Sequence, residues 1–399
     1  MSSRRIALAL MDPPLPFGNA ASRWYYVLLR ELVARGHRVT AFYGYQKKAD
    51  REATADLFPH RSYDMHCFPV EQRSRWASKV QSVRRPFSYP FSREYQDALA
   101  QRLSDGVDVL HLEQLWTGWT GWDYTDRALL HLHYAHSIDQ AAAPAGSLKE
   151  RVLRARADNA ERRILRHFHY ISALTPRLRT FASLVNPSAR TYTVPFGMDL
   201  TLYPYRDPVR QPVPVLGLIG SFNWTPSFLA GERLLTRLWP EIQCRVPRCR
   251  LLIVGRSARA AFPAFLQAPG VEIEENVADI LPYFRRLSVL AYAPAVGTGM
   301  KVKILEAFSL GVPVVTNAEG MEGLEGRDGE HAAIAEDDQG LIDRAVRLLN
   351  NHEQGCLLAR AARTLVENQC GLSHTVNMME TIHHEICVAR ENKPSAVAA

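Results

Sequence analysis

Short apolar runs alternate with longer stretches of helical periodicity along most of the chain. Runs rich in Val, Ile, Leu and Tyr are typical of buried strands. Because strands that alternate with helices form parallel sheets with helices on both faces, the pattern predicts α/β architecture throughout. The predicted strands cover residues 5–11, 37–43, 107–115, 128–135 and 168–175 in the first half, and residues 214–221, 250–255, 271–275, 287–293 and 313–317 in the second.

A cluster of prolines separates the two series of strands. Four prolines fall within residues 204–214, and such a cluster is typical of a linker. The sequence therefore predicts two doubly wound, Rossmann-like domains that face a central cleft. The expected N-terminal domain spans residues 1–200, the expected C-terminal domain spans residues 212–372, and residues 391–399 are expected to form a disordered tail.

Composition narrows the class of protein. The hydrophobic content of 47% in 399 residues supplies two cores, and no apolar run is long enough to span a bilayer. The apolar start of the chain is followed by Asp12 and prolines without a small-residue cleavage site, so it predicts a first strand rather than a signal peptide. The six cysteines lack C-x-x-C spacing, which indicates reduced thiols and a cytoplasmic protein.

Basic charge is concentrated in the first half. Residues 1–200 hold 28 Lys and Arg against 19 Asp and Glu, which indicates an anionic partner there. Residues 73–93 carry six basic and no acidic residues, interleaved with aromatic ones. This segment fits peripheral contact with an anionic membrane, a charged acceptor, or simply a solvated helix and loop. Nucleic acid is disfavoured, since no recognised binding motif accompanies the charge.

The stretch 294–320 carries the clearest candidate chemistry. Gly297 and Gly299 flank Thr298, a candidate N-cap, and would leave free N–H groups at the start of a helix. Lys301 and Lys303 then lie where the helix dipole favours anions, so a bound phosphate would explain them. Glu306 lies three residues after Lys303 on the same helical face, and its carboxylate could accept hydrogen bonds from hydroxyl groups such as those of a ribose. The simpler alternative is an exposed ion pair between Lys303 and Glu306.

The same stretch resembles a known family. The string G-T-G-M-K-V-K-I-L-E-A-F-S-L-G-V-P-V-V-T is similar to the donor-site helix of glycosyltransferase family 4, whose fold is GT-B. The resemblance implies that Glu306 holds the nucleotide ribose. Thr298 stands where the family has a first Glu that contacts the donor sugar, although a sub-group has this G-x-G-x-K-x-K pattern. A helix at residues 373–390 is expected to pack back on the first domain.

Other segments extend the resemblance over nearly the whole chain. The segment LLHLHYAHS resembles the family segment whose His reaches the donor sugar; His133 matches best and His136 is its competitor. The pair Gly18 and Asn19 partly matches a Gly pair that contacts donor phosphate or acceptor. The remaining assignments are Asn223 and Arg256 near the nucleotide, Lys301 and Lys303 in place of the usual Arg and Lys at the diphosphate, and Glu113 on the acceptor side.

The resemblance implies transfer of a sugar from a nucleotide-diphosphate sugar to an acceptor hydroxyl, with retention of configuration. The acceptor would be a glycan, a lipid-linked sugar or a small molecule. No D-x-D sequence occurs, so no bridging metal and no cofactor are expected. The alternatives are a sugar-nucleotide epimerase of the same fold, a nucleotide-binding protein without turnover and, least favoured, a nucleic-acid-binding protein.

Overall fold

The computed structural model describes residues 3–59, 63–70, 85–141 and 146–392, and the chain divides into two compact units. The first unit comprises Met1–Ser137, Pro144–Gly197 and Leu372–Ala399. The second comprises Ile138–Ala143 and Met198–Gly371. Each unit has its own sheet, and the two are described separately below.

Parallel strands form the sheet of the first unit, in the order β3-β2-β1-β4-β5-β6-β7. The central strand β1 is buried from Ile6 to Leu10, which matches its unbroken apolar run. A strand buried on both faces needs helices on each side. The strands are β1 (Arg5–Leu10), β2 (Arg38–Tyr45), β3 (Asp64–Pro69), β4 (Val109–Glu113), β5 (Ala128–Leu132), β6 (Tyr170–Ala173) and β7 (Arg190–Thr193).

Helices cover this sheet, and side-chain caps define several of their starts. Ser147 and Glu150 form a reciprocal capping box at the start of α6, and Thr175 caps α7, whose first residue is a proline. The helices are α1 (Ala20–Ala34), α2 (Lys48–Leu57), α4 (Arg93–Ser104), α6 (Leu148–His167), α7 (Pro176–Val185) and α15 (Leu372–Glu391), with 3₁₀ turns at Leu115–Trp119 and Trp122–Tyr124. The helix α5 (His136–Ala141) begins in this unit and belongs to the second unit from Ile138 on.

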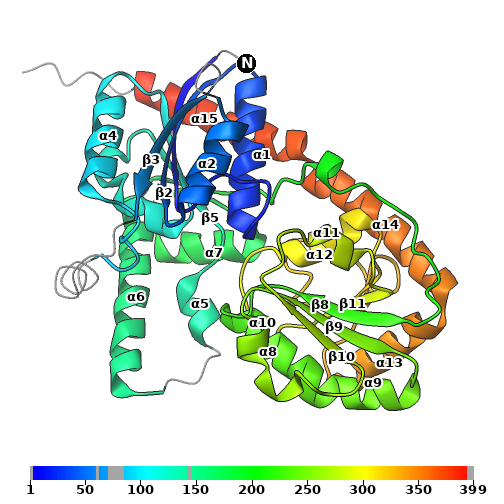
Figure 1. The fold of residues 1–399 in the computed structure, drawn as a ribbon. Coiled ribbons are helices and arrows are strands. Elements are labelled where there is room, and N and C mark those ends of the chain that lie inside the picture. The colour runs from blue at the N-terminus through cyan, green and yellow to red at the C-terminus, as the bar shows by residue number, and fades with distance from the viewer. Residues whose placement is uncertain (1–2, 60–62, 71–84, 142–145, 393–399) are drawn as a thin grey trace, which may run out of the picture. The chain divides into compact units, whose positions relative to one another are not determined.

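The helix α15 completes the first unit although it comes last along the chain. It lies beside α1, as the red and blue helices of Figure 1 show. Glu380 accepts a hydrogen bond from Arg35 Nη1 (2.6 Å) and pairs with His37 Nε2 (2.7 Å). These bonds join residues more than 340 positions apart. The helix expected at residues 373–390 is therefore present and packs on the N-terminal part of the chain.

A second parallel sheet, in the order β10-β9-β8-β11-β12-β13, forms the core of the second unit. Five of its strands coincide with the predicted ones, and the short strand β13 was not predicted. The strands are β8 (Val215–Ile219), β9 (Arg250–Gly255), β10 (Val271–Glu275), β11 (Val289–Tyr292), β12 (Val314–Thr316) and β13 (Ala333–Ile334). The helices are α8 (Thr225–Arg233), a π-helical turn (Leu234–Leu238), α9 (Trp239–Arg245), α10 (Ala258–Ala261), α11 (Leu281–Phe284), α12 (Val302–Leu310), α13 (Asp338–Asn350) and α14 (His352–Cys370), with 3₁₀ turns at Leu200–Leu202 and Pro263–Phe265.

The helix α12 ends as predicted but begins later. Gly311 takes a left-handed conformation (φ 85°) at its C-cap, where a Cβ atom would lie 2.0 Å from the carbonyl oxygen of Arg206. The N-cap is Lys301 and makes no side-chain capping bond. The prediction that Thr298 caps this helix is therefore wrong, because irregular backbone separates the two.

Two predicted segments lie largely outside the described residues. Of the basic stretch 73–93, residues 73–84 are not described, and in the remainder Phe87 and Tyr89 have exposed side chains. Residues 393–399 of the predicted tail are also outside. Across the described ranges, none of the helices is both long and apolar enough to cross a bilayer.

Candidate functional site

The loop before α12 in the second unit is held by acidic side chains. Gly297 and Gly299 take positive φ angles of 150° and 80°. The N–H of Gly297 donates to Glu319 Oε1 (3.1 Å), and the N–H of Thr298 donates to Asp139 Oδ1 (2.5 Å). These two N–H groups were expected to be free, but carboxylates already accept from them.

Lys301 supports this loop from within. Its ammonium donates to the carbonyl oxygens of Gly297 (3.1 Å) and Gly299 (2.6 Å) and lies 3.3 Å from Glu322 Oε2. The lysine side chain is 8% exposed. Lys301 therefore holds the backbone of the loop in place, and its charge is partly neutralised by Glu322.

Lys303 has a different environment. Its ammonium donates to Ser227 Oγ (2.7 Å) and lies 3.9 Å from the centre of the Tyr292 ring. Burial lowers the pKa of Lys303 to about 7; the charge of Lys301 acts in the same direction and that of Glu306 opposes it. In the part of the chain that the structure describes, no carboxylate forms an ion pair with Lys303. A bound anion would therefore stabilise the charged form of Lys303.

Glu306 lies one turn further along α12. Its side chain is buried and accepts a hydrogen bond from the hydroxyl of Tyr203 (3.2 Å). The predicted alternative of an exposed ion pair between Lys303 and Glu306 does not fit a glutamate at 2% exposure. Tyr203 orients the carboxylate within the second unit.

Asp139 is a residue that the sequence did not single out. It lies on α5 within the segment that belongs to the second unit, and its Oδ1 accepts from both the N–H and the hydroxyl of Thr298 (2.5 and 2.7 Å). Burial raises the pKa of Asp139 to about 6, against the two bonds from Thr298. Its Oδ2 is buried and has no hydrogen-bond partner among the described residues. A carboxylate thus lies at the loop where Thr298 itself carries none.

The two remaining candidates of the second unit follow neighbouring parallel strands. Asn223 lies in the turn after β8 and Arg256 in the turn after β9, and both side chains are exposed. The N–H of Phe222 donates to the carbonyl of Arg256 (2.9 Å), which joins the two turns. Both residues lie at the carboxyl edge of the sheet, where ligands of open α/β sheets bind.

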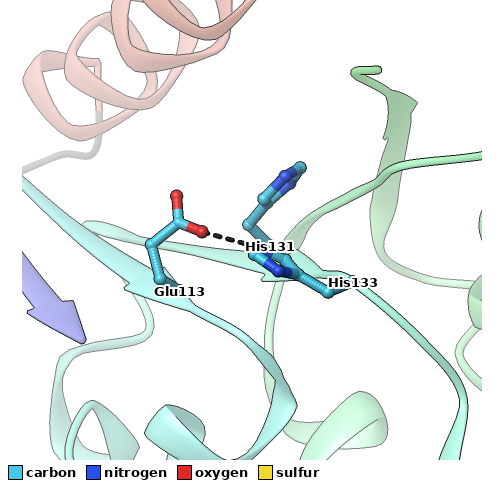
Figure 2. Close-up of side chains that lie close together, drawn as sticks. All are labelled: Glu113, His131 and His133. Carbon is cyan, nitrogen blue, oxygen red and sulfur yellow. Dashed lines mark hydrogen bonds and ion pairs between the residues drawn. The ribbon is translucent and has the colours of Figure 1, made fainter. Parts of the chain in front are cut away.

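In the first unit, Glu113 and His133 form a buried pair. Glu113 ends β4, and His133 follows β5, the next strand of the sheet. His133 Nε2 lies 2.7 Å from Glu113 Oε2 (Figure 2). The same oxygen also accepts from Trp24 Nε1 (3.1 Å). Burial acts to raise the pKa of Glu113, but the surrounding imidazoles and their hydrogen bonds hold it well below the usual value. The structure therefore places Glu113 in the interior, where it orients His133.

His136, the competitor of His133, has mainly aromatic neighbours. Its ring centre lies 5.3 Å from that of Phe87 and 5.8 Å from that of Trp116. Burial lowers the pKa of His136, which favours the neutral ring. Its main-chain N–H donates to Glu161 Oε1 (2.7 Å), so the start of α5 is held by a buried carboxylate.

Gly18 and Asn19 form the start of α1. Asn19 is the N-cap, and its side-chain oxygen accepts from the N–H of Ser22 (2.8 Å). Gly18 has φ 92°, and a Cβ atom added to it would meet no other atom within 4 Å, so only its backbone conformation requires glycine. The pair therefore shapes the turn between β1 and α1 and leaves the space beside Gly18 open.

Two family models match the sequence, one in each half. The model described as "Glycosyl transferase 4-like domain" matches residues 22–197, and the model described as "Glycosyl transferases group 1" matches residues 213–351. A search of curated proteins gave no match. Among solved structures, sucrose-phosphate synthase from Thermosynechococcus elongatus is similar, with a TM-score of 0.70 at 15% identity over 97% of this chain and 100% of the other.

Other solved structures are similar to this chain as well. HepE from Anabaena, in complex with UDP and glucose, gives a TM-score of 0.67 at 14% identity over 96% of this chain and 100% of the other. A glycosyltransferase from Rickettsia africae gives 0.65 at 13% identity over 97% and 99%. At such identities the likeness establishes the fold, and the two family models establish the kinship. The chain therefore belongs to the glycosyltransferases of the GT-B fold, with a 4-like domain followed by a group 1 domain.

Proposed function

We infer that the chain transfers a sugar from a nucleotide-diphosphate sugar to an acceptor hydroxyl of a glycan, a lipid-linked sugar or a small molecule. The observation that carries this inference is Lys303, a lysine near the N-terminus of α12 whose ammonium contacts a hydroxyl and an aromatic ring. The helix dipole and burial both disfavour its charge, and a diphosphate would compensate for both. HepE, a structural neighbour, has been solved with UDP-glucose, which supports a donor of this class.

Two carboxylates of the second unit suit the hydroxyl groups of such a donor. Glu306 accepts from Tyr203 and is assigned to the ribose. Asp139 Oδ2 is assigned to a hydroxyl of the donor sugar, because a buried carboxylate oxygen without a partner costs free energy that a donated hydroxyl would recover. For His133, the resemblance supplies the role of contacting the donor sugar, and Glu113 orients its ring through Nε2.

The proposed reaction breaks the bond between the anomeric carbon and the diphosphate oxygen and forms a bond from that carbon to the acceptor oxygen on the same face. The leaving diphosphate takes the acceptor proton. Positive charge near the diphosphate stabilises the negative charge that develops there, which is the largest contribution in many enzymes. We assign this charge to Lys303 and to the N-terminus of α12 rather than to a bridging metal ion. Lys301 acts indirectly, by holding the loop at Gly297 and Gly299.

A thermal-shift panel with UDP, GDP, ADP, CMP and dTDP tests the donor site. One diphosphate at 100 times its dissociation constant should stabilise the protein by about 2.7 kcal/mol, with and without EDTA. The Lys303→Met variant should lose this shift. Lys149→Met, on the exposed start of α6, is the matched control and should keep it.

Transfer is then tested with the matching sugar nucleotide and a set of acceptors. Formation of a glycosylated product with retained configuration supports the proposal. Conversion of the sugar nucleotide without an acceptor would instead indicate an epimerase. If no nucleotide shifts the melting temperature, the donor site and the proposed function are wrong.

A further inference from the structure

Three side chains of the first unit gather around one buried point. Glu113 and His131 have no exposed surface, and His133 is largely buried beside them. Each offers one ligand atom, and these atoms all lie within 4.8 Å of one another. Figure 2 shows both imidazole rings next to the carboxylate. The three residues come from the carboxyl ends of β4 and β5, which are neighbours in the sheet.

Part of this cluster lacks hydrogen bonds. His131 Nε2 is buried and has no hydrogen-bond partner among the described residues. Glu113 Oε1, by contrast, lies 3.0 Å from His111 Nε2, so this carboxylate oxygen already faces an imidazole nitrogen. A buried polar atom without a partner costs about 1–3 kcal/mol, so the unpartnered Nε2 of His131 beside this carboxylate indicates a place that binds a ligand.

The surrounding contacts prepare these side chains to bind a cation. His131 Nδ1 lies 2.7 Å from Ser172 Oγ, and an Nδ1–H that donates to this hydroxyl leaves Nε2 with a free lone pair. The indole of Trp24 donates to Glu113 Oε2 and orients the carboxylate. Metal-binding histidines and carboxylates are commonly held in this way by a second set of hydrogen bonds.

We propose that Glu113, His131 and His133 bind one zinc ion in the first unit. Two imidazoles and one carboxylate form a ligand set that suits Zn²⁺, whereas Mg²⁺ and Ca²⁺ prefer oxygen ligands alone. The ion replaces the direct bond between His133 and Glu113 and accepts the lone pair of His131 Nε2. It ties β4 to β5 at the carboxyl edge of the sheet.

Metal content tests the proposal without any activity assay. The tag-free protein, purified in metal-free buffer, should retain about one zinc per chain by mass spectrometry. After removal with dipicolinate, titration with Zn²⁺ alone should restore one equivalent and raise the melting temperature. Cobalt in place of zinc should give visible d–d absorption. Glu113→Gln and His131→Asn should lose the ion, and Ser172→Ala should weaken zinc binding about 10–100-fold.

The control variant is His169→Gln, which changes an exposed histidine of the same unit and should retain the ion. Circular dichroism shows whether each variant is folded, and Ser172→Ala keeps the proposal testable if a ligand variant does not fold. A metal-free protein that does not take up zinc would overturn the proposal and indicate that water satisfies these atoms. Equal zinc content in Ser172→Ala, Glu113→Gln and the unaltered protein would overturn it as well, because the zinc would then be adventitious.

Discussion

Binding of a nucleoside diphosphate should charge Lys303, and this can be measured as proton uptake. The pKa of Lys303 in the free protein is about 7, so at pH 8 about nine in ten molecules carry the neutral amine. A bound diphosphate favours the charged form and raises this pKa. We therefore expect uptake of about 0.9 proton per bound UDP at pH 8, and less at pH 7. The affinity should fall about tenfold, or about 1.4 kcal/mol, per pH unit above 7.

Isothermal titration calorimetry in two buffers of different ionisation enthalpy measures this uptake directly. The probe is UDP, or whichever diphosphate stabilises the protein. Lys303→Met should bind more weakly, with no uptake at pH 8, and Lys149→Met should behave as the unaltered protein. If the variant took up the same fraction of a proton, or if affinity were constant from pH 6 to pH 9, Lys303 would not be the group that meets the diphosphate.

Three further changes give distinct expectations. In urea titrations, Gly311→Ala should lower the free energy of unfolding much more than Gly329→Ala does. Both glycines have positive φ, but only at position 311 would the added Cβ atom meet a carbonyl oxygen, that of Arg206. Glu380→Gln should lower the free energy of unfolding by about 3 kcal/mol at pH 7, because it removes the charge that pairs with Arg35. The difference in stability between the variant and the unaltered protein should narrow as the pH falls through the lowered pKa of Glu380, and an unchanged melting temperature would contradict this. Asp139→Asn should weaken binding of the sugar nucleotide about tenfold or more in calorimetry while leaving the free diphosphate unaffected; equal loss for both ligands would assign Asp139 to the loop alone.

The fold could be predicted from sequence because its strands are unbroken apolar runs. Buried parallel strands such as β1, β4 and β9 leave little ambiguity, and glycine and proline mark the end of α12. The strand β13 is two residues long and carries no such pattern. The strand β3 was missed because its residues are mostly half-buried and alternate weakly.

The candidate site was predictable only where it is local. Lys303 and Glu306 share one helix, so their spacing places them on one face. Asp139 lies 159 positions from Thr298, and no local pattern marks a contact at that separation. Likewise, no local pattern shows that Glu113 contacts His133, because this contact arises only when the sheet places β4 beside β5. Free N–H groups before α12 were expected from the glycines alone, and the carboxylates that occupy two of them could not be foreseen.

The position of α15 bears on the order in which the chain can fold during synthesis. Its buried face, which includes Val376, Met379 and Ile386, packs into a unit that is otherwise made of residues before 198. The second unit has all but its short segment at Asp139 within residues 198–371, and these leave the ribosome before α15 does. The first unit to emerge is therefore the last to be completed. Until residue 386 is released, the part of α1 that packs against α15 stays uncovered.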